Sequence, residues 1–238
     1  MKNTTTLAEA FDEICTMDGP LNARLEAYAA KLRELNFPFA EAYEDLVARL
    51  YAGEIGRDAP AVGEIMPQFI LPTKSSRLVS LEELTAKGPV VISFNRGHWC
   101  PFCKIELRTI ASFHSEIAAH GAIVVSIMPD RQQFVGDLRS VTGDEILILT
   151  DMDNSYALSL GLALWLGDTL KALMQGRGLQ VETFQGNDGW FVPLPATFVV
   201  GRDSRVIARF VDPDFRKRME IDDILVALGR KGQGAANA

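Results

Sequence analysis

The sequence is poor in cysteine and in positive charge. Three cysteines among 238 residues are too few for a scaffold held together by disulfides. Acidic residues outnumber basic ones by 31 to 24, and the net charge of −7 argues against a nucleic-acid-binding face. The sequence lacks an uncharged apolar run long enough to cross a bilayer, and its first residues lack the apolar core of a secretion signal. We therefore expect a cytoplasmic globular protein that binds neither membranes nor nucleic acid.

Residues that bind metals are equally scarce. A structural zinc site needs four ligands, and beyond one pair of cysteines the chain offers only Cys15 and three scattered histidines. His114 and His120 are six residues apart in one predicted helix, so they do not share a face. Cys15 lies among apolar residues at helical spacing and is expected to be a buried, unreactive thiol. We expect no metal and no cofactor.

Hydrophobic periodicity divides the chain into two parts. The first part predicts three helices, over residues 7–17, 21–35 and 39–50. In the second part short apolar runs alternate with helical patterns. The runs predict strands at 90–94, 122–128, 146–149, 197–200 and 206–211. The helical patterns cover residues 100–120, 131–141, 155–160, 169–175 and 221–228, and residues 78–84 predict a turn into a short helix with Ser80 as its N-cap. The remainder of 161–192 is expected to be irregular.

This alternation predicts an α/β sheet covered by helices on both faces. We expect an N-terminal helical extension over residues 1–58, an α/β domain over 59–229 and a flexible tail over 230–238.

The most informative motif is Cys100-Pro101-Phe102-Cys103, between a predicted strand and a predicted helix. A thiolate at a helix N-terminus faces unpaired backbone N–H groups and the positive end of the helix dipole, which lowers its pKa. Pro101 suits the first turn of a helix that presents Cys100. The pattern is typical of a thiol–disulfide site, and two ordinary core cysteines are the alternative.

Three further positions are candidates. Arg96 or His98 could place a cation beside Cys100, although both could equally be solvated loop residues. Pro195 stands just before a predicted strand, where a cis bond would turn the backbone of Leu194 toward the site. From the residues alone, an ordinary trans proline is favoured there.

Four segments carry a family resemblance: residues 62–72, 94–103, 195–200 and 211–216. They resemble the alkyl hydroperoxide reductase/thiol-specific antioxidant family, the peroxiredoxins and their relatives. The second segment is similar to the Arg-Gly-x-Trp-Cys-Pro-aromatic-Cys signature of a peroxiredoxin-like subgroup. The resemblance spans about residues 60–228. It implies a thioredoxin-like fold with a central mixed sheet flanked by helices, and a cis Pro195 opposite the cysteines.

The resemblance also implies reduction of a peroxide, with electrons from thioredoxin or a similar dithiol reductant, and it allows a homodimer. In this interpretation Cys100 attacks, Cys103 resolves the product and Arg96 gives electrostatic support. Attack by Cys103 stays open as the reverse order. The residues expected to contact the substrate are Trp99, Leu194 and Pro195.

Two other functions stay open, a thioredoxin-like protein disulfide reductase and a binding module without catalysis. Thioredoxins bury an acid in the strand before the motif, but this strand offers only Ser93. We therefore expect the second cysteine to lack its usual proton acceptor. The run of charged residues from Asp212 to Arg218 is expected to be a solvated loop.

Overall fold

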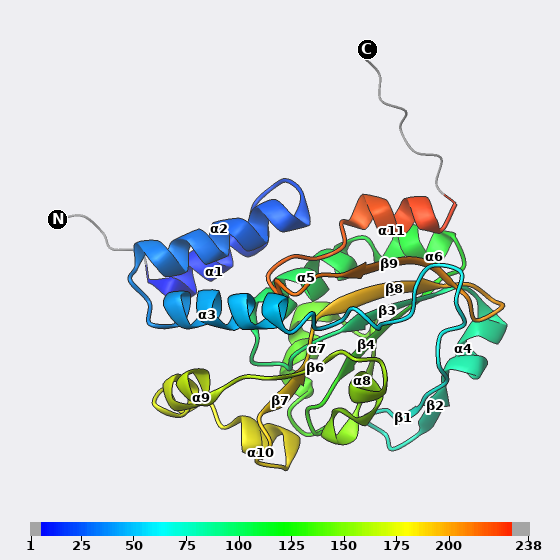
Figure 1. Cartoon of the computed structure of the whole chain (residues 1–238). Coiled ribbons are helices and arrows are strands. Elements are labelled where there is room, and N and C mark those ends of the chain that lie inside the picture. The colour runs from blue at the N-terminus through cyan, green and yellow to red at the C-terminus, as the bar shows by residue number, and fades with distance from the viewer. Residues whose placement is uncertain (1–5, 230–238) are drawn as a thin grey trace.

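A five-stranded mixed sheet forms the centre of the fold (Figure 1). The computed structural model describes residues 6–229, so the predicted flexible tail lies outside the described residues. The strand order is β5-β4-β3-β8-β9. Strands β3 (Val90–Phe94), β4 (Ile123–Met128) and β5 (Leu147–Thr150) are parallel. Strand β8 (Ala196–Val200) runs antiparallel to β3, and β9 (Val206–Val211) antiparallel to β8. All five predicted strands are confirmed.

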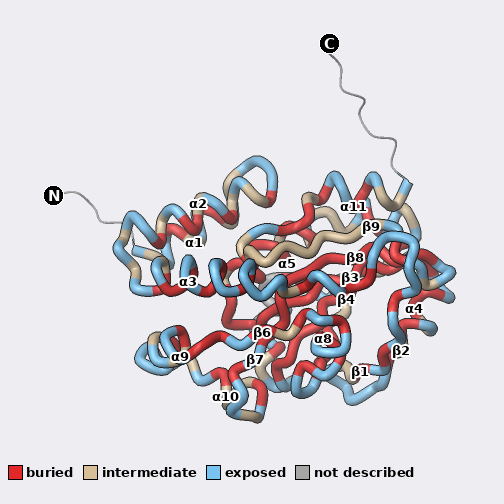
Figure 2. The backbone as a smooth tube through the Cα atoms, viewed as in Figure 1, coloured by how far each residue is buried: buried red, intermediate tan, exposed pale blue. Residues whose placement is uncertain are grey.

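The central strands are buried on both faces, which explains their continuous apolar sequence (Figure 2). Successive side chains of a strand point to opposite faces. On β3, Ile92 and Phe94 therefore join one apolar cluster and Val91 joins the other.

Helices cover both faces, as predicted. The Val91 face packs against apolar side chains from α5 (Pro101–Ser112), α6 (His114–Ala119), α7 (Gly136–Thr142) and α11 (Ile221–Ala227). The other face packs against α8 (Ser155–Ser159) and α9 (Asp168–Gln175). The expected long helix over 100–120 is interrupted at Phe113, whose N–H bonds to Ile110 in a tightened last turn. Helix α7 begins at Gly136, five residues later than predicted.

Helices α1 (Leu7–Thr16), α2 (Leu21–Glu34) and α3 (Phe39–Ala52) confirm the three predicted N-terminal helices. Thr6 and Glu9 form a reciprocal capping box that begins α1. Apolar side chains of all three helices join the same cluster as Phe94, so the extension shares the core of the sheet domain. None of the helices in the described part of the chain has the length and apolarity of a membrane span.

The short elements were the hardest to predict. Ser80 caps α4 (Leu81–Lys87) as expected, but β2 (Leu78–Ser80), which pairs with β1 (Ile70–Pro72), stands where a turn was predicted. The region expected to be mostly irregular also contains β6 (Ala163–Trp165), α10 (Val181–Gln185) and β7 (Phe191–Pro193). Elements of three to five residues are too short to show a hydrophobic period.

Candidate active site

The loop from β3 to α5 carries the cysteine motif and ends at Cys100, the N-cap of α5. The backbone N–H of Cys103 donates to Cys100 Sγ at 3.4 Å, and Pro101 occupies the first turn. Cys100 and Cys103 are both unbonded thiols. The sequence therefore predicted correctly that a sulfur meets the open N-terminus of a helix.

Asp130, which follows β4, anchors this loop. Its Oδ2 accepts from the backbone N–H of His98 and contacts the His98 ring Nδ1, both at 2.7 Å. Gly97 has φ of +142°, and a Cβ there would lie 2.5 Å from Trp99 Nε1 and 2.9 Å from both Asp130 carboxylate oxygens. His98 is thus bound to Asp130 rather than to Cys100. Only glycine fits at position 97, because a side chain there would collide with Trp99 and Asp130.

Arg96 is the cation that reaches Cys100. Its Nη2 donates to Cys100 Sγ at 3.3 Å, and the residue is fully buried. The guanidinium lies 3.9 Å from the ring centroid of Phe215 and 5.6 Å from those of Tyr43 and Trp99. Within residues 6–229, its Nε and Nη1 have no hydrogen-bond partner. Arg96 therefore places a buried positive charge beside the sulfur, with Tyr43 as its other polar neighbour.

A second buried cation, Arg218, reaches Cys103. Its Nη2 lies 3.7 Å from Cys103 Sγ, and its Nε donates to Glu106 Oε2 at 2.7 Å. The other oxygen of Glu106 accepts from Ser93 Oγ at 3.1 Å. As expected, β3 offers no acid, only Ser93. A buried carboxylate nevertheless lies near the second cysteine, because Glu106 comes from α5, one helical turn beyond Cys103.

These neighbours shift the two thiols in opposite directions. Burial alone would raise the pKa of Cys100, but the hydrogen bond from the Cys103 thiol and the charges of Arg96 and Arg218 hold that pKa well below its ordinary value. Burial raises the pKa of Cys103, and the hydrogen bond and charge of the Cys100 thiolate raise it further. Burial also raises the pKa of Glu106. Cys100 is therefore the more acidic thiol of the pair.

The N-terminal helices close the site. Cys100 and Cys103 are each 0 % exposed. Tyr28 of α2 and Tyr43 of α3 pack edge-to-face on Phe102 of α5, with ring centroids at 5.2 and 6.1 Å. The helix start does carry Cys100 at its N-cap, but the sulfur is buried, because α2 and α3 lie over it. The sulfurs are nevertheless not ordinary core cysteines, since guanidinium groups contact both.

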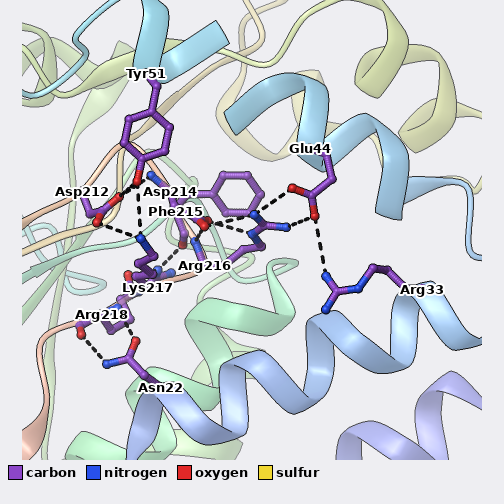
Figure 3. Close-up of polar contacts among 10 residues, drawn as sticks. All are labelled: Asn22, Arg33, Glu44, Tyr51, Asp212, Asp214, Phe215, Arg216, Lys217 and Arg218. Carbon is purple, nitrogen blue, oxygen red and sulfur yellow. Dashed lines mark hydrogen bonds and ion pairs between the residues drawn. The ribbon is translucent and has the colours of Figure 1, made fainter. Parts of the chain in front are cut away.

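A polar segment that we call the C-terminal clasp, residues 212–220, ties α2 and α3 to the sheet domain (Figure 3). Arg216 donates to both carboxylate oxygens of Glu44 on α3, at 2.6 and 3.1 Å. Asn22 of α2 exchanges two hydrogen bonds with the backbone of Arg218, at 2.8 and 2.9 Å. Glu220 accepts from the backbone N–H groups of Leu21 and Asn22, both at 2.9 Å. The run from Asp212 to Arg218 is therefore a structural interface, and its interpretation as a solvated loop was wrong.

Leu194 and Pro195 are buried in the segment that joins β7 to β8. Peptide bonds are trans throughout residues 6–229, so the expected cis bond before Pro195 was wrong. The Leu194 N–H donates to Leu162 O at 2.6 Å, which continues the pairing of β6 with β7 up to the start of β8. That N–H is therefore not free to bind a substrate.

Sequence reasoning missed Glu106 and Arg218 as neighbours of the cysteines. The sequence did carry a signal for Glu106. It is an acidic residue on the same helical face of α5 as the apolar residues Cys103 and Ile110, and an acid on a buried face is unusual. Arg218 gave none, because it stood in a run of mixed charges. Cys15 is half-buried on α1, and burial raises its pKa, in line with an unreactive thiol. Within the described residues, no three groups of the kind that ligate metals gather at one point.

The strand order and the cysteines at the start of a helix define a thioredoxin-like thiol protein. The chain belongs to the AhpC/TSA family, whose sequence pattern matches residues 62–209. A Helicobacter pylori relative named "Putative peroxiredoxin bcp" is 29% identical over 96 residues, which are 40% of this chain and 62% of the relative. A protein of the same name from a second strain is 30% identical over an equal stretch. The match thus spans less than two thirds of these relatives.

Solved structures agree with the fold. Peroxidoxin BcpB from Mycobacterium tuberculosis has a TM-score of 0.54 and 21% identity, covering 71% of this chain and 96% of that one. Reduced Prx3 from Vibrio vulnificus in complex with H2O2 has the same TM-score and identity, covering 71% and 98%. A central mixed sheet flanked by helices, with an N-terminal helical extension, is confirmed.

Proposed function

We propose that the protein reduces peroxides through Cys100 and that Cys103 resolves the product as an intramolecular disulfide. The observation that carries the proposal is the hydrogen bond from buried Arg96 to Cys100 Sγ at 3.3 Å, at the N-terminus of α5. It supports a thiolate on Cys100 rather than on Cys103. The Cys103 hydrogen bond and the charges of Arg96 and Arg218 lower the pKa of Cys100, whereas burial and Cys100 itself raise the pKa of Cys103.

The first step is attack of the Cys100 thiolate on one oxygen of the peroxide. The O–O bond breaks, sulfur gives up two electrons, and the leaving oxygen takes a proton to form an alcohol, or water when the substrate is H2O2. The unpartnered Nε and Nη1 of Arg96 are suited to hold the peroxide oxygens as negative charge moves onto the leaving one. Cys100 becomes a neutral sulfenic acid.

The second step follows from the loss of that charge. The Cys100 thiolate is one cause of the raised pKa of Cys103, so its conversion to sulfenic acid makes Cys103 more acidic. Glu106 is our candidate for the proton acceptor, because its buried carboxylate lies one helical turn beyond Cys103 on α5, while Arg218 stays protonated and donates to both residues. Cys103 sulfur then attacks Cys100 sulfur, a disulfide forms and water leaves. A dithiol such as thioredoxin returns the two electrons, and we keep the cytoplasm as the expected compartment because reduced thiols persist there.

Burial of both sulfurs favours this function over a protein disulfide reductase. A peroxide is small, whereas a protein disulfide would have to displace α2 and α3 to reach Cys100. Trp99 stays the proposed substrate contact, because its ring packs near Arg96.

The test is consumption of H2O2 with dithiothreitol as the electron donor. We expect Cys100→Ser to abolish turnover, because it removes the attacking thiolate, and Cys15→Ser to retain full activity as the matched control. Cys103→Ser should accumulate sulfenic acid on Cys100 after one equivalent of peroxide, seen by mass spectrometry as one added oxygen atom.

Full activity in Cys100→Ser would reject the assignment of the attacking residue. Insulin reduction measured alongside separates the alternatives, since a disulfide reductase would reduce insulin and leave peroxide untouched. A binding module would do neither and would show an ordinary thiol pKa.

A further inference from the structure

A cavity of about 400 Å³ lies beside the thiol site. Its walls come from α1, the α2–α3 region, the start of α5 and the end of α9. The lining is mostly apolar and unusually aromatic, with six rings: Phe11, Tyr28, Phe37, Phe39, Tyr43 and Trp99. Most of this wall belongs to residues before position 62, outside the part of the chain that the family pattern matches.

The side chains that line this cavity on the side of α5 also lie next to Cys100. Trp99 and Pro101, the two neighbours of Cys100 in the sequence, both line it. Trp99 and Tyr43 also line the pocket of Arg96, with ring centroids 5.6 Å from its guanidinium. One layer of side chains therefore separates the cavity from the thiolate.

The charged side chains of the lining are two cations and one acid. Lys104 lies one turn into α5, Arg177 follows α9, and Asp12 comes from α1. The Arg177 guanidinium lies 4.0 Å from the ring centroid of Phe37, so an exposed cation stands over the aromatic wall. Within residues 6–229 neither Lys104 nor Arg177 has an ion-pair partner, which leaves the lining one positive charge in excess.

We propose that this cavity binds an amphipathic carboxylate, with its apolar chain against the aromatic wall and its carboxylate on Arg177 and Lys104. The choice rests on charge complementarity. An apolar body suits the rings, and a guanidinium without a partner matches a carboxylate with two parallel hydrogen bonds.

Binding is tested first, without any need for activity. We expect dodecanoate to bind the full chain saturably in isothermal titration calorimetry, in the wild type and in Cys100→Ser. Arg177→Glu should weaken binding about tenfold, because it removes one charge-assisted contact. Ala8→Trp, which places a bulky ring in the cavity from an exposed lining position, should weaken it at least as much. Lys74→Glu, an exposed charge reversal outside the lining, is the matched control and should bind as the wild type does.

Absence of saturable binding, or equal affinity in the wild type and Arg177→Glu, overturns the proposal. Because binding is measured without turnover, its outcome does not depend on whether Cys100 reduces peroxides.

Discussion

At the scale of single residues, two guanidinium groups decide the chemistry of the cysteine pair. Arg96 contacts Cys100 and Arg218 contacts Cys103, and both cations are buried. Of these two cations, only Arg218 has a carboxylate partner within the described part of the chain, and that partner is Glu106. Arg96 instead lies among aromatic rings, and its guanidinium donates to Cys100 Sγ, where a thiolate would be its anionic partner. A buried charge without such a partner would be costly, and each of these two groups therefore stabilises the charged form of the other.

Arg96→Met keeps the length of the side chain and removes its charge. We expect the pKa of Cys100 to rise by about 1–3 pH units, because a close opposite charge shifts a pKa by that amount. The measurement is thiolate absorbance against pH in a Cys103→Ser background, with Arg209→Met as the control. An unchanged titration would mean that Arg96 does not hold the thiolate.

At the scale of elements, α2 depends on a distant residue for its start. Pro20 precedes it and contributes no side-chain cap. Glu220 of the C-terminal clasp instead accepts from two backbone N–H groups in the first turn, those of Leu21 and Asn22, and from Asn22 Nδ2. Because α2 also carries Tyr28, the clasp holds part of the cover over the sulfurs.

Glu220→Ala should lower the free energy of unfolding by about 1–2 kcal/mol, the cost of losing a helix N-cap. It should also speed the reaction of the cysteines with Ellman's reagent, since α2 is then held less firmly over them. Urea denaturation and the release of thionitrobenzoate measure the two effects. Asp223→Ala, an exposed acid in the first turn of α11, is the control and should change neither. A destabilised protein with unchanged thiol reactivity would show that α2 does not control access.

At the scale of the whole molecule, the reduced cysteines take part in the contacts that join the N-terminal helices to the sheet domain. Arg218 contacts Cys103, while its backbone exchanges hydrogen bonds with Asn22 of α2. A disulfide would remove the thiolate that Arg96 faces, whereas a bridge across four residues contributes only about 2 kcal/mol of loop entropy, less than a bridge across a long loop. Oxidation should therefore loosen the packing that closes the site, which is also when a dithiol reductant must reach it.

We expect the oxidised protein to unfold at a lower urea concentration than the reduced one. The difference should be about 1.4 kcal/mol for each pH unit by which the Cys100 pKa is lowered. Because the folded pKa lies below the ordinary value of 9.0, this stability is present near pH 9 and is lost as pH falls through the folded pKa. Above pH 9 the raised pKa of Cys103 acts in the opposite direction.

Denaturation of both forms between pH 5 and 9 measures this difference, with Cys100→Ser as a control that should not respond to the oxidant. A gap that stays constant across this range would contradict the role of the thiolate charge.

Local features of the sequence were enough to predict the helices and strands of ordinary length, and the residues Cys100, Cys103 and Arg96 of the site. Apolar periodicity predicted the five central strands, and proline after Cys100 predicted a helix start beneath a sulfur. Arg96 could be proposed because it is four residues from Cys100. The interruption at Phe113 and the three-residue strands could not be predicted, since nothing in their local pattern sets them apart from their surroundings.

What the sequence by itself determined is therefore the pair of cysteines, the sheet and the class of chemistry, because these depend on residues that are close together in the chain. Only the tertiary structure decided that the site is closed, that an acid lies beside it and that an aromatic cavity adjoins it. Glu106 and Arg218 are 112 positions apart in the sequence. The helices that cover the sulfurs, α2 and α3, are separated from the motif by β1, β2, α4 and β3. Contacts of that kind depend on how whole elements pack, and no local pattern of residues records them.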